Sequence, residues 1–204
     1  ANMKDNIFYK IYGFLDRSEE TLIIDLSRSE EEILSSIRKR YKRYIRNLSD
    51  QIEIITIENH QITNSTIDYF IDVAKRDTSQ KINEKDYIHL HKWLQNNQGI
   101  LIQAKLIESQ KAIGYLAVLN FKKSAYDYMA AVDDEYKELR VSHAMKVTSL
   151  FKLKELGIEF YELGTYTNHP KLYRLPNAKQ KGITEFKSGF ADKIMLFPIA
   201  EKFY

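Results

Sequence analysis

The pattern of apolar and polar positions predicts helices that alternate with short strands. Residues 21–26 form an apolar run of strand length, and residues 51–58 alternate between apolar and polar side chains. Between them, Ser29 and Glu32 form the serine–glutamate pair of a capping box, which begins a helix. Apolar residues then recur every three or four positions: Ile33, Ile37, Tyr41, Tyr44 and Leu48. We therefore expect one continuous helix between the two strands.

The middle of the chain predicts two helices followed by three strands. Residues 65–75 and 84–94 carry apolar side chains at helical spacing, and residues 100–107, 112–121 and 125–132 have the composition of strands. The short turn at residues 109–111 indicates an antiparallel meander. Gly114, inside the second of these strands, indicates a bulge or a close approach of another backbone or side chain.

The last third predicts another helix and strand, a glycine-bracketed segment and a final strand. Ser142 is the expected N-cap of a helix that ends at Gly157, and residues 158–163 follow as a strand. In residues 182–190, two phenylalanines four positions apart would pack on one helical face, while Lys187 leaves from another side. A plain amphipathic turn is the alternative reading. Residues 194–197 form the last expected strand.

This order of elements predicts an α+β (mixed α/β) fold. The central sheet would be mixed and largely antiparallel, with helices on its faces. No linker-like stretch divides the sequence, so we expect a single domain over residues 3–204. We expect Ala1 and Asn2 to be a tag remnant.

Composition narrows the classes of function. The chain has 204 residues, 44% of them hydrophobic, and no cysteine, which excludes disulfides and thiolate metal sites. No stretch approaches the length of a transmembrane segment, and we expect a cytoplasmic protein. We also expect no metal: His89 and His91 are two positions apart on a predicted helix and therefore face different sides. Glycine fingerprints for dinucleotides and nucleoside triphosphates are absent.

At two places, the residue types alone indicate a possible binding or catalytic site. The helix start at Ser142, directly after Arg140, could bind a phosphate through its first backbone N–H groups; ordinary capping is the alternative. Asp127, between two tyrosines on a strand, is a candidate general base if it lines a cleft. Its alternative is the solvent-facing side of an antiparallel strand.

The second half of the first predicted helix is strongly basic. Six of its residues carry a positive charge, with no acid between residues 37 and 49: Arg38, Lys39, Arg40, Lys42, Arg43 and Arg46. Three readings stay open, namely a solvated face, a phosphate-binding surface for a nucleotide or RNA, and a patch for acidic lipid. The net charge of only +3 argues against DNA as a partner.

Several of these parts together resemble a known family. Residues 21–26 leading into a capped helix, residues 142–145 opening a helix that closes at residues 154–158, and residues 161–164 all resemble a FemAB-like acyltransferase domain of the GNAT superfamily. The most specific part is residues 182–190, which are similar to the family's glycine–x–x–x–phenylalanine–lysine–x–glycine–phenylalanine signature. The resemblance spans roughly residues 21–197.

The resemblance implies a GNAT-like sheet and transfer of an acyl or aminoacyl group to an amine. The donor would be a thioester such as acyl-CoA or a charged tRNA, and the acceptor an amino-sugar or cell-envelope precursor. Lys187 would stabilise charge on the transferred carbonyl, with Asp127 as the second catalytic candidate. The remaining candidates are Arg140, Ser142, His143 and Ala144 for the donor, and Arg43, Arg46, Tyr166 and Glu185 for the substrate.

Two departures from the family leave alternatives open. Peptidoglycan enzymes of the family have two tandem domains, and this sequence has room for one. GNAT enzymes hold the pyrophosphate of coenzyme A in a glycine-containing loop before the central helix, and residues 138–144 contain no glycine. The alternatives are a catalytically degenerate GNAT-like binding domain and an anion- or nucleic-acid-binding module that uses residues 38–46. The sequence does not determine the oligomeric state.

Overall fold

The computed structural model describes residues 12–48, 50–78, 82–167 and 175–202. The expected tag remnant, Ala1 and Asn2, lies outside these residues. The chain forms two compact units, which we call the central unit (Asp25–Tyr161) and the terminal unit (Ala1–Ile24 with Glu162–Tyr204). That residues 3–204 form one domain stays a prediction.

Within the described residues, seven strands hydrogen-bond in the order β3-β4-β5-β6-β7-β2-β8. The strands are β2 (Glu19–Asp25), β3 (Ile52–Ile57), β4 (Gly99–Leu106), β5 (Ala112–Phe121), β6 (Ser124–Val132), β7 (Phe160–Thr165) and β8 (Lys193–Phe197). The pairs β3/β4, β4/β5, β5/β6 and β2/β8 are antiparallel. The predicted α+β class with a mixed, largely antiparallel sheet is confirmed.

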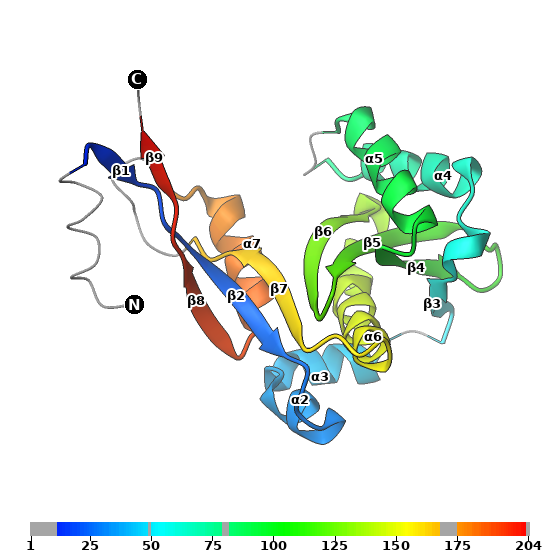
Figure 1. Cartoon of the computed structure of the whole chain (residues 1–204). Coiled ribbons are helices and arrows are strands. Elements are labelled where there is room, and N and C mark those ends of the chain that lie inside the picture. Colours follow the sequence, from blue (N-terminus) through cyan, green and yellow to red (C-terminus); the bar gives the residue numbers. More distant parts are fainter. Residues whose placement is uncertain (1–11, 49, 79–81, 168–174, 203–204) are drawn as a thin grey trace. The chain divides into compact units, whose positions relative to one another are not determined.

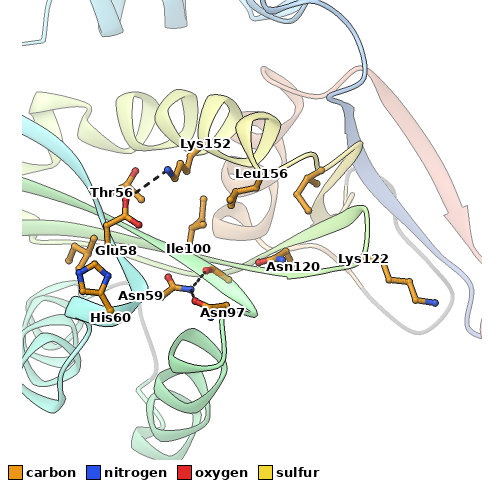
Figure 2. Close-up of a pocket in the computed structure, with 13 residues that line it drawn as sticks. Thr56, Glu58, Asn59, His60, Asn97, Ile100, Asn120, Lys122, Lys152 and Leu156 are labelled. Carbon is orange, nitrogen blue, oxygen red and sulfur yellow. Dashed lines mark hydrogen bonds and ion pairs between the residues drawn. The ribbon is translucent and has the colours of Figure 1, made fainter.

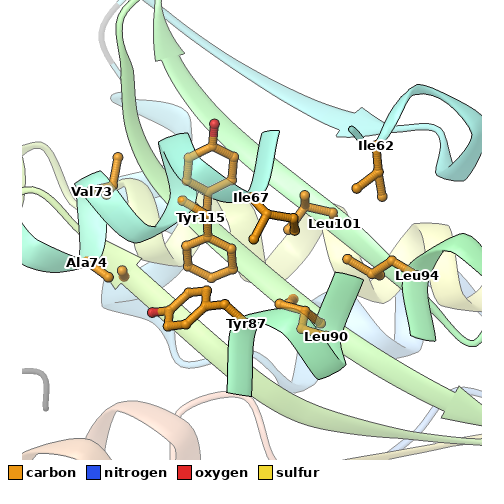
Figure 3. Packing of buried hydrophobic residues seen from close by; sticks show 12 residues of the cluster. Ile62, Ile67, Val73, Ala74, Tyr87, Leu90, Leu94, Leu101 and Tyr115 are labelled. Carbon is orange, nitrogen blue, oxygen red and sulfur yellow. The ribbon is translucent and has the colours of Figure 1, made fainter. Parts of the chain in front are cut away.

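Helices cover both faces of the sheet in the central unit (Figure 1). On one face lie α4 (Asn64–Arg76) and α5 (Glu84–Gln95), and on the other lies α6 (Val141–Glu155). The core under α4 and α5 is aromatic: the ring of Phe70 stacks on Tyr115 at 4.9 Å and meets Tyr87 edge-on at 5.1 Å (Figure 3). Strand alternation sends Leu101 to this core, where it is completely buried.

Gly114 has the packing role that its place in a strand predicted. The pairing of β4 with β5 shifts register beside it, because Ala104 pairs with Gly114 and Lys105 with Ala112. A Cβ atom at Gly114 would lie 3.1 Å from Cε of Met145 on α6. The missing side chain therefore lets α6 pack closely against β5.

The first predicted helix is two helices, so the prediction of one continuous helix was wrong. The capping box of Ser29 and Glu32 is present and begins α2 (Glu30–Ser36), but Ile37 is extended (ψ 134°) and α3 (Lys39–Arg46) follows as a separate helix. The hydroxyl of Ser36 donates to the carbonyl of Ile33, 2.8 Å away. Such side-chain bonds compete with the helical backbone pattern. The break still leaves Ile33, Ile37 and Tyr41 buried.

The terminal unit contains β2, β8, most of β7, helix α7 (Ala178–Ser188) and a two-stranded ribbon of β1 (Phe14–Asp16) with β9 (Ala200–Lys202). Helix α7 begins four residues before the segment predicted from sequence, because Asn177 and Gln180 form a capping box. Thr184 of α7 is buried, and its hydroxyl accepts the backbone N–H of Thr167 at 3.1 Å. This bond ties α7 to the chain that leaves β7.

Candidate functional site

Helices α3 and α6 meet through three aromatic rings. Tyr41 and Tyr44, three residues apart on α3, both meet the imidazole of His143 on α6 edge-on, with ring centroids 4.4 and 5.1 Å away. His143 is buried, and this burial lowers the pKa of its imidazole to about 4. The neutral imidazole therefore belongs to the packing between the helices at pH 7. Ala144, the next residue, is also buried.

A basic surface lies beside this contact. We define it as the exposed side chains Lys39, Arg40, Arg43 and Arg46 of α3 together with Arg140 at the start of α6. Tyrosines lie beneath it: the guanidinium carbon of Arg40 is 5.4 Å from the ring centroid of Tyr41, and that of Arg140 is 5.9 Å from Tyr44. Arg140 also donates from Nη2 to Glu138 Oε2 at 3.2 Å. Guanidinium groups exposed in this way suit phosphate, because they bind it through parallel N–H groups.

Helix α6 begins within this surface, two residues before the N-terminus expected from sequence. Arg140 is the N-cap, in the left-handed conformation (φ 57°), and its side chain forms no cap bond. Ser142 is the second helical residue and half-buried, so the prediction that it is the N-cap was wrong. The N-terminal end of a 15-residue helix carries a partial positive charge, which adds to that of the basic surface.

The segment before α6 is a closed 3₁₀ helix, η3 (Asp134–Leu139). The backbone N–H groups of Glu135, Tyr136 and Arg140 donate to Asp133 Oδ1, the Asp133 carbonyl and the Lys137 carbonyl, respectively. These three amides are therefore occupied within the segment. A diphosphate cannot be held by amides that are already bonded, so these three amides are not part of a phosphate cradle.

Asp127 takes part in a buried polar group on the α6 side of the sheet. Its Oδ1 accepts a hydrogen bond from Lys146 Nζ at 2.6 Å and from the hydroxyl of Tyr161 at 3.0 Å. The side chains of Lys146 and Asp127 are 2% and 9% exposed, respectively. Burial, and the nearby Asp127 carboxylate, raise the pKa of the Tyr161 hydroxyl well above its usual value. The alternative that Asp127 faces solvent is wrong.

A bulge in β6 turns Asp127 toward α6. Ala117 of β5 pairs with Met129, but the next residue, Val118, pairs with Asp127, so Tyr128 is an extra residue in β6. Met129 and Tyr128 pack against the core under α4 and α5. Without the bulge, Asp127 would share a face with Met129, two residues away. The extra residue instead sends it to the opposite face.

Three sequence candidates lie in the terminal unit. Lys187, in the last turn of α7, donates from Nζ to the carbonyl of Leu163 in β7. Glu185 of α7 is exposed, and Tyr166 follows β7, where its N–H donates to the carbonyl of Glu20 at 2.7 Å. Phe186 and Phe190 pack edge-on with centroids 5.4 Å apart, as their spacing predicted.

The structure thus brings together Arg140, Ser142 and His143 with the basic helix that carries Arg43 and Arg46. Sequence reasoning missed Lys146 and Tyr161. A signal for Lys146 existed: it lies four and seven residues before Leu150 and Leu153, on the apolar stripe of α6. A lysine on such a stripe requires a buried partner.

Among the residues that the structure describes, no group of three or more His, Asp or Glu side chains could hold a metal ion. None of the described helices has the length and apolar character needed to cross a membrane.

Comparison with known proteins identifies the fold. FemX matches with a TM-score of 0.71 at 12% identity, over 95% of this chain and 66% of that one. The C-terminal domain of a putative lysylphosphatidylglycerol synthetase from Agrobacterium fabrum matches with a TM-score of 0.61 at 17% identity, over 94% and 62%. A tandem GNAT protein from the clavulanic acid biosynthesis pathway matches with a TM-score of 0.53 at 12% identity, over 98% and 57%.

These matches confirm the predicted fold, which resembles that of FemX and of a GNAT protein. In each case this chain spans less than two thirds of the structure it resembles. At the level of sequence, no protein-family model matches the chain, and no curated protein does either.

Proposed function

We propose that this chain is a transferase domain that moves an aminoacyl group from a charged tRNA to an amine. The observation that carries the proposal is the basic surface at the start of α6, on a fold shared with FemX and with a putative lysylphosphatidylglycerol synthetase. The second of these neighbours is named for an aminoacylated product. A fold alone does not determine a function, and the basic surface is the feature that distinguishes one donor from another.

The basic surface favours RNA as the donor. Arg40, Arg43 and Arg46 are exposed along one short helix without an acid among them. Side chains in such a row contact successive phosphates of a nucleic-acid backbone, and each contact releases a counterion. Arg140 and the positive end of α6 extend the same surface.

The segment before α6 argues against acyl-CoA as the preferred donor. In residues 134–140, the amides of Glu135, Tyr136 and Arg140 are already bonded within η3. Binding the pyrophosphate of coenzyme A through these three amides would require η3 to unwind. An RNA bound by the side chains of α3 needs no such change.

The reaction proposed is direct attack of the amine on the ester carbonyl of the aminoacyl-tRNA. The new bond is the amide C–N bond, the bond that breaks is the ester C–O bond to the terminal ribose, and the amine proton passes to the ribose oxygen. Negative charge develops on the carbonyl oxygen during attack, and a cation lowers the barrier there. We propose Lys187 for this role. The acceptor in the proposal is an amino-sugar or another amine of a cell-envelope precursor.

Asp127 is proposed as a positioning residue. A carboxylate with an ammonium group at 2.6 Å already has its strongest partner, and it is buried. It fixes β6 to α6 and so holds the bulge at Tyr128 in place. Substrate contact is not required for this role.

The test is transfer from tRNA charged with a radiolabelled amino acid to a panel of amino-sugars and small peptides, with acetyl-CoA as the competing donor. We expect a labelled amide product from the charged tRNA and a much slower reaction with acetyl-CoA. RNA binding without transfer to any acceptor would identify a binding domain. Faster transfer from acetyl-CoA would contradict the proposed donor.

A further inference from the structure

The central unit contains a cavity far from the basic surface. Its volume is about 400 Å³, and it lies at the C-terminal end of α6, among the ends of β3 and β5, the start of β4 and the turn after β5 (Figure 2). Helix α6 has 15 residues, so its two ends are about 20 Å apart at 1.5 Å per residue. The size is typical of a small-molecule site. The transfer reaction proposed above does not use this cavity.

Two asparagines in the wall are oriented by each other. Asn59 Nδ2 donates to Asn97 Oδ1 at 3.0 Å and to the carbonyl of Gly99 at 3.2 Å. These bonds occupy the amide nitrogen of Asn59 and the amide oxygen of Asn97. The carbonyl oxygen of Asn59 and the amide nitrogen of Asn97 form no hydrogen bond with another described residue. The wall therefore offers one fixed acceptor and one fixed donor.

A third amide lies on β5. The backbone N–H of Asn120 donates to the carbonyl of Gln98 at 3.0 Å, which anchors the end of the strand. Its side-chain amide has no hydrogen-bond partner among the residues that the structure describes. An amide carries both donors and an acceptor, and a hydroxyl group can pair with either. Three such amides around one cavity suit a ligand with several hydroxyl groups.

The charges in the wall favour an anion. Lys122, in the turn after β5, is exposed, and Lys152 of α6 is 28% exposed. Lys152 Nζ is 3.9 Å from the Glu58 carboxylate and 3.4 Å from the carboxylate of Glu155, which is not part of the wall. With one glutamate and two lysines, the wall has a net charge of +1. Ile100, Leu156 and Ile158 supply an apolar side that can cover a carbon ring.

We propose that this cavity is a second ligand site and that it binds a hydroxyl-rich anion of monosaccharide size, such as a sugar phosphate. The amides of Asn59, Asn97 and Asn120 bind the hydroxyl groups. The ammonium group of Lys152 binds the anionic group, Lys122 adds positive charge at the edge of the cavity, and the apolar side packs against the ring.

The first experiment compares the thermal unfolding of the chain with four probes: glucose 6-phosphate, glucuronate, glucose and inorganic phosphate. At about 100 times its dissociation constant, a bound sugar anion raises the midpoint by about 5–10 °C. We expect the two sugar anions to give this shift and glucose and phosphate to give less. The proposal is overturned if none of the probes shifts the unfolding midpoint. It is also overturned if inorganic phosphate shifts the midpoint as much as glucose 6-phosphate does.

The second experiment locates the site. Asn120→Asp places a negative charge among the amides, and Lys122→Asn removes a cation while keeping a residue that tolerates the left-handed backbone (φ 53°). Each variant should weaken glucose 6-phosphate binding about tenfold or more, which corresponds to about 1.4 kcal/mol. Asn177→Asp is the matched control, because aspartate caps α7 as well as asparagine does and adds the same charge in the other unit.

Unchanged affinity in both cavity variants would place the ligand elsewhere and overturn the assignment. Because Asn120 and Lys122 are remote from the basic surface, loss of sugar-phosphate binding in these variants leaves RNA binding intact. The two proposals can therefore fail separately.

Discussion

The ammonium nitrogen of Lys146 lies 2.6 Å from Oδ1 of Asp127, with both side chains almost completely buried. The hydroxyl of Tyr161 contacts both groups, at 2.9 Å from the lysine nitrogen and 3.0 Å from the carboxylate. A buried ion pair adds little net stability over apolar residues, but loss of one partner leaves the other charged and unpaired. The pair therefore makes β6 and α6 dependent on each other.

Lys146→Met should lower the free energy of unfolding by about 3 kcal/mol or more, because the Asp127 carboxylate would lose its cation in the interior. The double variant Lys146→Met with Asp127→Asn should recover part of this loss, since no buried charge remains. Urea unfolding of the single and double variants measures the difference. If the two substitutions were simply additive, the ion pair would not be coupled as the structure indicates.

His143 predicts a loss of stability in mild acid. Its pKa is about 4 in the folded chain against an ordinary value near 6.5, because burial disfavours the charged imidazolium. Between these values the unfolded chain binds the extra proton. The free energy of unfolding therefore has its full value above about pH 6.5. It decreases by about 2 kcal/mol as the pH falls toward 4.

Unfolding free energies measured from pH 7 to pH 4 check this expectation. His143→Phe should flatten the pH dependence, because a phenyl ring keeps the packing against Tyr41 and Tyr44 without titrating. His60→Gln, at an exposed position, is the control and should leave the wild-type slope. A slope that survives in His143→Phe would assign the effect to other groups.

Neutralising the basic surface should weaken RNA binding and its dependence on salt. The triple variant Arg40→Gln, Arg43→Gln and Arg46→Gln removes three exposed charges from α3. If each contacts a phosphate, the slope of log affinity against log salt should become shallower by about 2 to 3. Fluorescence anisotropy with a labelled tRNA over a range of salt concentrations measures this slope.

A matched control removes three exposed charges on the opposite face of the central sheet. Lys75, Lys85 and Lys92 on α4 and α5 are exposed, and their replacement by glutamine changes the net charge equally. Equal loss of affinity in both triple variants would mean that RNA responds to total charge and not to this surface.

Lys187→Met should reduce aminoacyl transfer by about 100-fold while the chain stays folded. The variant also loses the bond from Lys187 Nζ to the Leu163 carbonyl, which should lower the unfolding free energy by only about 1 kcal/mol. Transfer rates and unfolding curves of the same preparation separate the two effects. Lys181→Met, at an exposed position on the same helix, should change neither. Undiminished transfer by the Lys187 variant would remove this residue from the mechanism.

Apolar periodicity was sufficient to predict most of the elements, because burial of one face is what makes these helices and strands stable. It could not show the break at Ile37, since Ile33, Ile37 and Tyr41 are buried with or without it. The N-terminus of α6 was misplaced because Ser142 is a common N-cap, whereas Arg140 adopts a left-handed conformation that its residue type does not favour.

The candidate site was harder to predict, and the reason is visible at Asp127. Alternation along β6 gives a face to each residue only while the register is unbroken. The extra residue at Tyr128 reverses the side on which Asp127 lies, and no local sequence signal marks it. Its partner Lys146 lies 19 positions later on another element, so only the folded chain brings the two together.

The central unit is one uninterrupted stretch of chain, whereas the terminal unit is built from both ends of the described sequence. On a ribosome, the residues of β2 are synthesised well before those of β8, so Ile23 has to wait for Lys193 before the two can pair. The central unit can fold during this interval, while Leu22, Ile23 and Ile24 leave the exit tunnel without their partner strand. Nascent chains of this protein are therefore most open to chaperones and to aggregation at β2.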